Sequence, residues 1–131
     1  MGLLLDTHIW VWSMLEPDRL SRNVVRALQS KEADLWLSPI SIWELTMLVH
    51  AGRVQLETDV IVWTKDALRR APLNQAPLTE EIAFASAAVE LPHKDPADRF
   101  LVATANELEL KLVTADQRLI ESRAVKTLAN T

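Results

Sequence analysis

Three short runs of apolar residues stand out along the chain. They cover residues 2–5, 35–37 and 110–113, and each has the length of a strand that is buried on both faces. A weaker run at residues 125–128 predicts a strand at the edge of the same sheet. Because strands buried on both faces occur in parallel sheets, these runs predict a central parallel sheet.

Segments with the 3.6-residue spacing of helices separate these strands. In chain order we expect helices at residues 8–15, 21–30, 59–70 and 80–91. Ser21, Thr58 and Thr79 are the expected N-caps of the last three. Pro72 and Pro77 enclose a short extended piece, on either side of which the helices at 59–70 and 80–91 look like an inserted pair.

Two further helices begin near a proline. After the strand at residues 35–37, either Ser38-Pro39 opens a helix or the capping box Ser41-Ile-Trp-Glu44 opens it slightly later. We expect this helix to end at Gly52 in the left-handed conformation. The segment Asp95-Pro-Ala-Asp98 reads as an N-cap, a proline at the first helical position and an acid in the first turn.

Alternating strands and helices with short connections indicate the α/β class with right-handed crossovers. The 131 residues, of which 49% are hydrophobic, supply one core and leave no room for a second. We therefore predict a single α/β domain over residues 1–131, built in three layers with helices on both faces of the parallel sheet.

Composition narrows the chemistry open to this chain. It has no cysteine, which excludes disulfides, thiol nucleophiles and Cys-based metal sites. Its two glycines, Gly2 and Gly52, cannot form a glycine-rich nucleotide-binding loop. The net charge of -4 argues against nucleic-acid binding through a global basic field. A local basic rim remains open, and its candidates are Arg19, Arg22, Arg69 and Arg70.

We expect no targeting signal at the amino terminus. Residues 1–6 are apolar but lack the cationic start of a signal peptide, and Asp6 interrupts them. No apolar stretch approaches the roughly 18 residues of a membrane span. We expect a soluble cytoplasmic protein without a membrane partner.

Four acidic residues occupy equivalent places in the predicted fold. Asp6 and Asp116 follow strands, whereas Glu44 and Asp98 lie in the first turns of helices. Each has an ordinary structural explanation, as a turn residue or as an acid near a helix N-terminus. In a parallel sheet, however, strand ends and the following helix starts share one edge, so these four side chains can converge.

If the four carboxylates converge, their mutual repulsion destabilises the fold unless a cation is bound. Two carboxylates about 4 Å apart repel each other by roughly 4 kcal/mol at an effective dielectric constant near 20. Oxygen ligands without cysteine point to Mg²⁺, with Mn²⁺ as a substitute. The set therefore predicts a metal site of Asp6, Glu44, Asp98 and Asp116.

Four blocks of sequence resemble the PIN-domain nucleases, specifically the VapC toxins of bacterial toxin-antitoxin pairs. The blocks are LLLDTHIW ending at Trp10, SIWEL ending at Leu45, HKDPADRFLVATA ending at Ala105, and LVTAD ending at Asp116. They occur in the family's order and span residues 2–116, and the DPADR block and the terminal T-x-D are the specific parts.

The resemblance implies a PIN-like fold and a metal-dependent endoribonuclease that acts as a toxin. It implies that Asp6, Glu44, Asp98 and Asp116 are catalytic and hold one or two Mg²⁺ ions that activate water. It also implies an RNA substrate, a cognate antitoxin and a homodimer. The alternative from another class is a catalytically inactive PIN-like module that binds protein.

For each of four residues close to these acids, the sequence allows two roles. Thr7 and Thr114 either orient a carboxylate or water near the metal, or bind backbone. Asp95 caps its helix or contacts metal-bound water, and we favour the cap. Arg99 contacts an RNA phosphate or pairs with a neighbouring acid.

The histidines and tryptophans near the site are expected to be structural. His8 and His93 lack the spacing of paired ligands, so we expect surface or packed side chains and no catalytic role. Trp10 and Trp12 point about 200° apart on a helix, so both cannot face one core. We expect one of them to face a partner, such as the antitoxin.

Overall fold

The computed structural model describes all 131 residues. Its centre is one sheet with the strand order β3-β2-β1-β4-β5, and every neighbouring pair is parallel. The strands are β1 (Leu3–Leu5), β2 (Leu35–Leu37), β3 (Asn74–Gln75), β4 (Lys111–Thr114) and β5 (Thr127–Ala129). The predicted parallel sheet is confirmed, although the last strand begins two residues later than expected.

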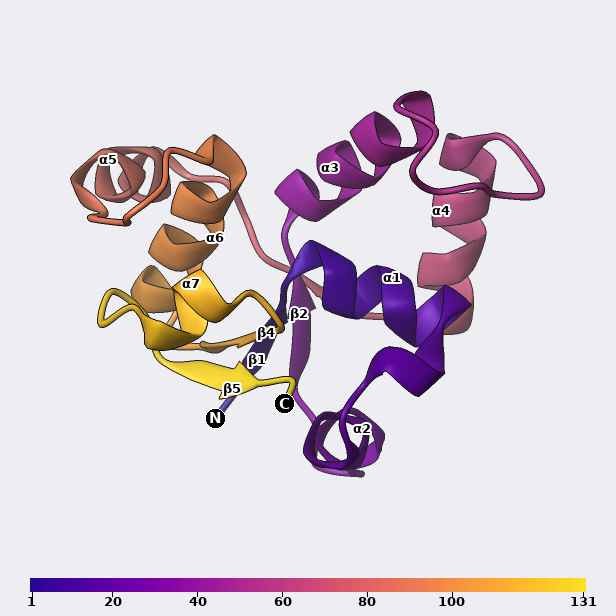
Figure 1. Ribbon diagram of the computed structural model, residues 1–131, viewed down its shortest axis with the longest axis horizontal. Coiled ribbons are helices and arrows are strands. Elements are labelled where there is room, and N and C mark those ends of the chain that lie inside the picture. Colours follow the sequence, from indigo (N-terminus) through magenta and orange to yellow (C-terminus); the bar gives the residue numbers. More distant parts are fainter.

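Helices cover both faces of this sheet (Figure 1). One side carries α1 (Thr7–Leu15), α2 (Arg22–Gln29), α3 (Pro39–His50) and α4 (Val60–Arg70), together with the short 3-10 helix η1 (Pro17–Arg19). The other side carries α5 (Glu80–Ala88), α6 (Pro96–Glu107) and α7 (Gln117–Glu121). The three-layer α/β architecture predicted from the sequence is therefore confirmed.

The apolar runs are buried on both faces because the strands alternate between two cores. Leu4 and Leu112 join the core under α6, whereas Leu5 and Val113 join the core under α1 and α3. All four side chains are at most 2% exposed. This two-sided burial explains why the strands read as continuous apolar runs.

The helices at 59–70 and 80–91 do not form an inserted pair. The strand β3 lies between them in the chain and pairs with β2, while α4 packs on α3 and α5 packs on α6. They therefore lie on opposite sides of the sheet (Figure 1). The first begins one residue late because Asp59 is its cap instead of Thr58, and the second ends at Ala88.

Gly52 ends α3 as the sequence predicts. Its φ of 73° is left-handed, its N–H donates to the Val49 carbonyl at 3.0 Å, and the Arg53 N–H donates to the Leu48 carbonyl at 2.9 Å. These two bonds form a Schellman motif, which terminates a helix by turning the chain.

Replacing Gly52 by alanine should lower stability through the backbone alone. A Cβ at this position meets no atom within 4 Å, so only the left-handed conformation is penalised, by about 1 kcal/mol. We expect Tm to fall by roughly 3 °C. Gly52→Asn is the matched control and should lose less, because asparagine tolerates this region. Equal melting of wild type and Gly52→Ala in thermal scans would contradict the prediction.

The connections place one edge of the sheet at a topological switch point. From β1 the chain crosses to the side of α1–α4, whereas from β4 it crosses to the side of α7 (Figure 1). Because β1 and β4 are neighbours, a crevice opens between their carboxyl ends, where ligands bind in such sheets. Asp6 and Asp116 follow these two strands.

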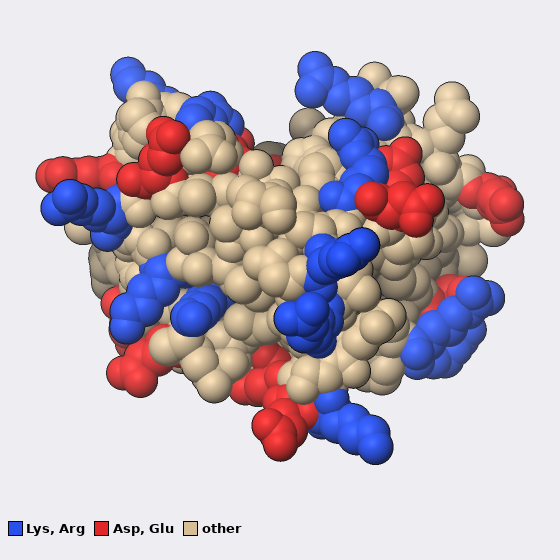
Figure 2. All heavy atoms as spheres, turned by 60° about the horizontal axis from the view of Figure 1, so that its bottom comes forward, with Lys and Arg blue, Asp and Glu red and all other residues tan.

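Charge on the surface is mixed. In the view of Figure 2, Lys and Arg side chains lie dispersed among Asp and Glu and form no continuous field of one sign. This agrees with the net charge of -4 and leaves any nucleic-acid contact to a local feature. None of the helices has the length and apolar content needed to span a bilayer.

Candidate active site

The four predicted acids line one cavity of about 290 Å³ at this edge of the sheet. We call it the acidic pocket, and its lining residues are Asp6, His8, Trp12, Glu44, Asp95, Asp98, Ala115, Asp116 and Arg118. The acids come from four different segments, between residues 6 and 116. Their convergence agrees with the rule that places ligands at the switch point of a parallel sheet.

Asp6 is fixed from two sides. Its Oδ1 accepts a hydrogen bond from the Thr7 N–H at 2.8 Å, which makes it the N-cap of α1, and its Oδ2 accepts one from the Thr114 hydroxyl at 2.7 Å. The side chain is buried, and burial raises the pKa of this carboxyl despite the two bonds. Asp6 is therefore a rigid acceptor whose negative charge lacks a cationic partner within ion-pair distance.

Glu44 is free for the pocket because α3 begins earlier than the capping box requires. The Ser38 hydroxyl caps the helix by accepting the Ile40 N–H at 3.1 Å, and Pro39 is the first helical residue. This settles the start that the sequence left ambiguous. Glu44 thus lies in the second turn and lines the acidic pocket.

A hydroxyl network holds Glu44. The Thr7 hydroxyl donates to Glu44 Oε1 at 2.5 Å and lies 2.9 Å from the Ser41 hydroxyl. Since Thr7 has one hydroxyl proton, Ser41 is the donor in the second bond. Burial, and then the negative charges of Asp6, Asp95 and Asp98, raise the pKa of Glu44 to about 7.

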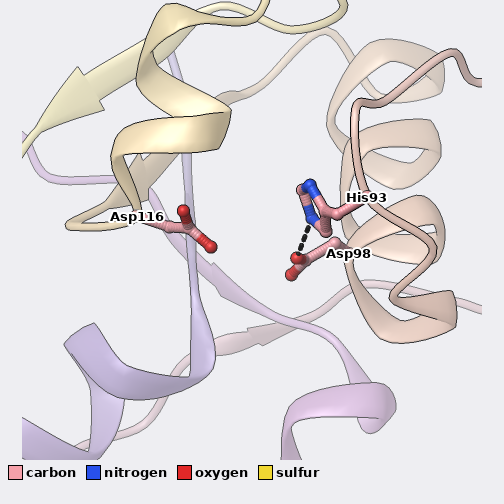
Figure 3. Close-up of side chains that lie close together, drawn as sticks. All are labelled: His93, Asp98 and Asp116. Carbon is pink, nitrogen blue, oxygen red and sulfur yellow. Dashed lines mark hydrogen bonds and ion pairs between the residues drawn. The ribbon is translucent and has the colours of Figure 1, made fainter.

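Asp98 is paired with a residue that the sequence analysis set aside. Asp95 caps α6 by accepting the Ala97 N–H at 3.0 Å, which leaves Asp98 in the first turn facing the pocket. His93 Nε2 lies 2.7 Å from Asp98 Oδ2, and His93 Nδ1 is buried without a hydrogen-bond partner (Figure 3). Burial raises the pKa of Asp98 to about 6, and the His93 bond opposes this rise.

His8 is exposed and His93 is packed, as expected, and the absence of a catalytic role for either stays a prediction. His93 touches a candidate metal ligand, and His8 lines the acidic pocket. The contact between His93 and Asp98 was not predicted, because the spacing of paired histidine ligands is absent. The informative signal was the position of His93 just before the Asp95-Pro96 helix start, from which its side chain folds back onto the first turn.

Asp116 has the opposite electrostatic environment. It caps α7 by accepting the Arg118 N–H at 2.9 Å, and its other oxygen accepts from Arg118 Nη2 at 2.9 Å. These bonds hold the pKa of Asp116 below its usual range. The Asp116 N–H donates to the Thr114 hydroxyl at 3.0 Å, so Thr114 connects Asp116 to Asp6.

Two further expectations have definite outcomes. Asp95 both caps α6 and lines the acidic pocket. Arg99 Nη1 donates to the Val89 carbonyl at 2.7 Å and forms no ion pair, so it ties α6 to the end of α5. This corrects the ion-pair role considered for Arg99, whereas its contact with an RNA phosphate stays a prediction. The arginine that lines the pocket is Arg118, which sequence reasoning missed.

The pocket fits a hard divalent cation. One ligand atom each of His93, Asp98 and Asp116 lie within 4.8 Å of one another (Figure 3). Asp6 and Glu44 line the same cavity but do not belong to this compact trio. Buried carboxylates with raised pKa values gain from a nearby cation, and a set dominated by oxygen suits Mg²⁺ or Mn²⁺.

Comparison with known proteins agrees with this geometry. The chain is 36% identical over 124 residues to Ribonuclease VapC22 of Mycobacterium tuberculosis, covering 92% of each protein. The fold resembles VapBC2 from Rickettsia felis bound to a DNA fragment from their promoter, with a TM-score of 0.72 at 18% identity over 98% of each chain. It also resembles a toxin-antitoxin complex from Klebsiella pneumoniae, with a TM-score of 0.67 at 22% identity over 96% of this chain and 97% of that one.

The two structural likenesses establish the fold, and the relative from Mycobacterium tuberculosis covers almost the whole sequence. The PIN domain family model matches residues 3–124, which include all four acids of the pocket. This chain therefore belongs to the PIN domain family.

Proposed function

We propose that this chain is a metal-dependent endoribonuclease and the toxin of a toxin-antitoxin pair, with residues 1–131 forming one nuclease domain. The observation that carries the proposal is the convergence of Asp6, Glu44, Asp98 and Asp116 on one cavity. The similarity to a protein named as a ribonuclease supports it. The proposed place of action is the cytoplasm, where RNA substrates are found.

We propose Mg²⁺ as the metal, with Mn²⁺ as a substitute, and Asp6, Glu44, Asp98 and Asp116 as the residues that hold it. A bound ion of this kind lowers the pKa of a coordinated water and offsets negative charge on the phosphate. Whether one ion or two are held, every proposed protein ligand is an oxygen atom. His93 is not among these ligands and orients the Asp98 carboxylate through its contact with Oδ2.

Side chains around the acids orient their carboxylates by hydrogen bonds. Thr7 holds the carboxylate of Glu44 and Thr114 holds that of Asp6, while Arg118 holds that of Asp116. Three of the acids therefore have fixed directions. Such contacts around ligands preserve metal affinity. Arg118 places a positive charge at the rim, where it can meet an RNA phosphate.

The pocket is suited to hydrolysis by water. It contains no serine, cysteine or lysine nucleophile, and its carboxylates are the proposed metal ligands. Attack of water on phosphorus with loss of the 3'-oxygen leaves a 5'-phosphate and a 3'-hydroxyl, which are the products we expect.

The proposed partners are a cognate antitoxin and a second copy of the chain. Structural neighbours are described as VapBC and toxin-antitoxin complexes, which supports an antitoxin for this chain. Trp10 is buried against Trp63, whereas Trp12 lies at the pocket, so the tryptophans do face different ways. Exposed Trp43 and Met47 on α3 give an apolar surface for the proposed homodimer.

Cleavage of RNA by the purified chain tests the proposal. We expect Mg²⁺ or Mn²⁺ to support cleavage of single-stranded RNA and EDTA to abolish it, because the acids hold no phosphate without a cation. Sequencing the product ends checks the 5'-phosphate. An absence of cleavage with either metal, together with stable antitoxin binding, would favour the alternative of an inactive protein-binding module.

A further inference from the structure

A second groove adjoins the acidic pocket. It has a volume of about 540 Å³ and shares His8 and Trp12 with the pocket, so the two hollows meet along one wall. We call it the α1 groove and define it by His8, Trp12, Leu15, Arg19, Leu48 and Arg53. None of the four acids lines it, and its role is separate from holding the metal.

The groove follows one face of α1 away from the pocket. His8, Trp12 and Leu15 are spaced by four and three residues and form a stripe, which Arg19 of η1 continues. The distance from His8 to Leu15 along the helix is about 10 Å, the length of roughly three stacked nucleotides. The opposite wall is the end of α3 and the turn at Gly52, which supplies Leu48 and Arg53.

The chemistry of the groove is aromatic and cationic. The Arg19 guanidinium lies 4.4 Å from the centre of the Trp12 ring, and the His8 and Trp12 rings are 5.7 Å apart. Arg53 is exposed and forms no side-chain hydrogen bond or ion pair. Arg19 pairs with Glu16, the only acid among the lining residues, at 3.0 Å. The free charge of the groove is therefore positive.

We propose that the α1 groove binds the single-stranded RNA segment that flanks the scissile phosphate. This inference rests on the proposed ribonuclease function. An unpaired base stacks at the Trp12–Arg19 pair, and Arg53 holds a backbone phosphate. The acidic pocket repels RNA phosphates where no cation is bound, so the affinity for the flanking strand has to come from outside it.

Charge favours RNA over a peptide in this groove. A protein segment that enters the acidic pocket needs basic side chains to match its carboxylates. The same basic segment would be repelled by Arg19 and Arg53 in the groove. RNA meets the opposite situation, because its phosphates match the arginines and its bases match the aromatic rings.

Binding and cleavage measurements test the groove. Affinity for a fluorescein-labelled oligoadenylate is read by anisotropy in EDTA, where RNA is not cleaved, so the result does not depend on catalysis. We expect Arg53→Gln and Arg19→Gln to weaken binding about fivefold to tenfold, and Arg53→Gln to reduce the salt slope by about 0.7. Arg123→Gln, between α7 and β5, is the control with the same charge change and should bind as wild type does.

Two additional readouts separate contact from structural damage. With Mg²⁺ present, the groove variants should raise KM while kcat changes less than twofold, because the groove contributes uniform binding. Oligoadenylate should quench the tryptophan fluorescence of wild type more than that of Trp12→Phe, which retains a stacking ring but loses the indole. Equal melting temperatures of the arginine variants and wild type verify folding.

The proposal is overturned if both groove variants bind oligoadenylate as tightly as Arg123→Gln does. Undiminished RNA binding with loss of binding to a co-expressed antitoxin would also overturn it and assign the groove to a protein. If wild type binds RNA through the groove but cleaves none with Mg²⁺ or Mn²⁺, the groove assignment stands and the proposed nuclease function fails.

Discussion

Asp6→Asn is expected to abolish RNA cleavage and to relieve the growth arrest that follows expression of the chain without its antitoxin. The variant replaces a buried carboxylate with a neutral amide and so removes one of the proposed ligands. Losing a charge that acts directly on the reacting centre costs several kcal/mol, and we expect activity to fall at least about 100-fold. Initial rates on a short RNA with Mg²⁺ measure the loss.

Asp6→Asn is expected to retain the fold. Asparagine is as good an N-cap as aspartate, so the bond from the Thr7 N–H can persist, and the amide can donate to the Thr114 hydroxyl. Asp59→Asn is the matched control, because Asp59 caps α4 through the Ile61 N–H at 3.0 Å and lies outside the acidic pocket. Asp59→Asn should remain active and toxic.

A substitution at a second acid tests whether the loss of activity in Asp6→Asn comes from a disturbance confined to that residue. Asp98→Asn changes a different element and should lose activity to a similar degree, since its carboxylate belongs to the compact trio with His93 and Asp116. Retained toxicity in both Asp6→Asn and Asp98→Asn would remove RNA cleavage at this pocket as the cause of growth arrest.

Local sequence signals predicted most elements of the fold correctly. Strands β1 and β4 read as apolar runs because both of their faces are buried. Ser21 and Asp95 cap helices where expected, and Ser38 is one of the two caps that the sequence left open. The position of the four acids at one edge followed from parallel topology alone. These features depend on burial and capping, which act over a few residues.

Features that depend on distant contacts were missed or misread. The strand β3 has only two exposed residues, Asn74 and Gln75, and exists because it pairs with β2. The sequence indicated an extended piece between Pro72 and Pro77, but no periodicity identified it as a strand of the sheet, so α4 and α5 looked like an inserted pair. Packing of α4 on α3 and of α5 on α6 then decides their places.

The direction of long side chains was also not predicted from the sequence. Arg99 follows Asp98 directly, yet it points to the Val89 carbonyl, while Arg118 turns back onto Asp116. Each arginine donates to an acceptor within reach of its long side chain. The sequence does not show which nearby carbonyl or carboxylate is left without another donor. The same holds for His93, whose approach to Asp98 depends on the path of the loop before α6.

The raised pKa values in the pocket predict how the metal-free protein responds to pH. For Glu44, the folded-state pKa is about 7 against 4.5 for the ordinary carboxyl, so stability from this group is fully present below about 4.5 and is lost as pH rises through about 7. Asp98, at about 6 against 3.8, contributes in the same direction. We expect Tm in EDTA to fall across this interval.

Glu44→Gln should therefore melt above wild type at about pH 8 in EDTA and level with it at about pH 4, where Glu44 is protonated in both states. Glutamine can still accept the Thr7 hydroxyl. Solvent reaches the half-buried carboxylate, and screening reduces the expected gain to about 1 kcal/mol, or roughly 3 °C.

Asp116→Asn is the control of opposite sign, because Arg118 already stabilises the charged form of Asp116 and its removal should not raise Tm. Mg²⁺ at ten times its Kd should raise the free energy of unfolding of wild type by about 1.4 kcal/mol. The gain should be smaller for Glu44→Gln, because the variant lacks the carboxylate charge that the ion neutralises. Calorimetric scans at both pH values, with EDTA and with Mg²⁺, measure all three proteins. A gain for Glu44→Gln that is equal at both pH values would show that better packing, and not relief of a buried charge, raised its stability.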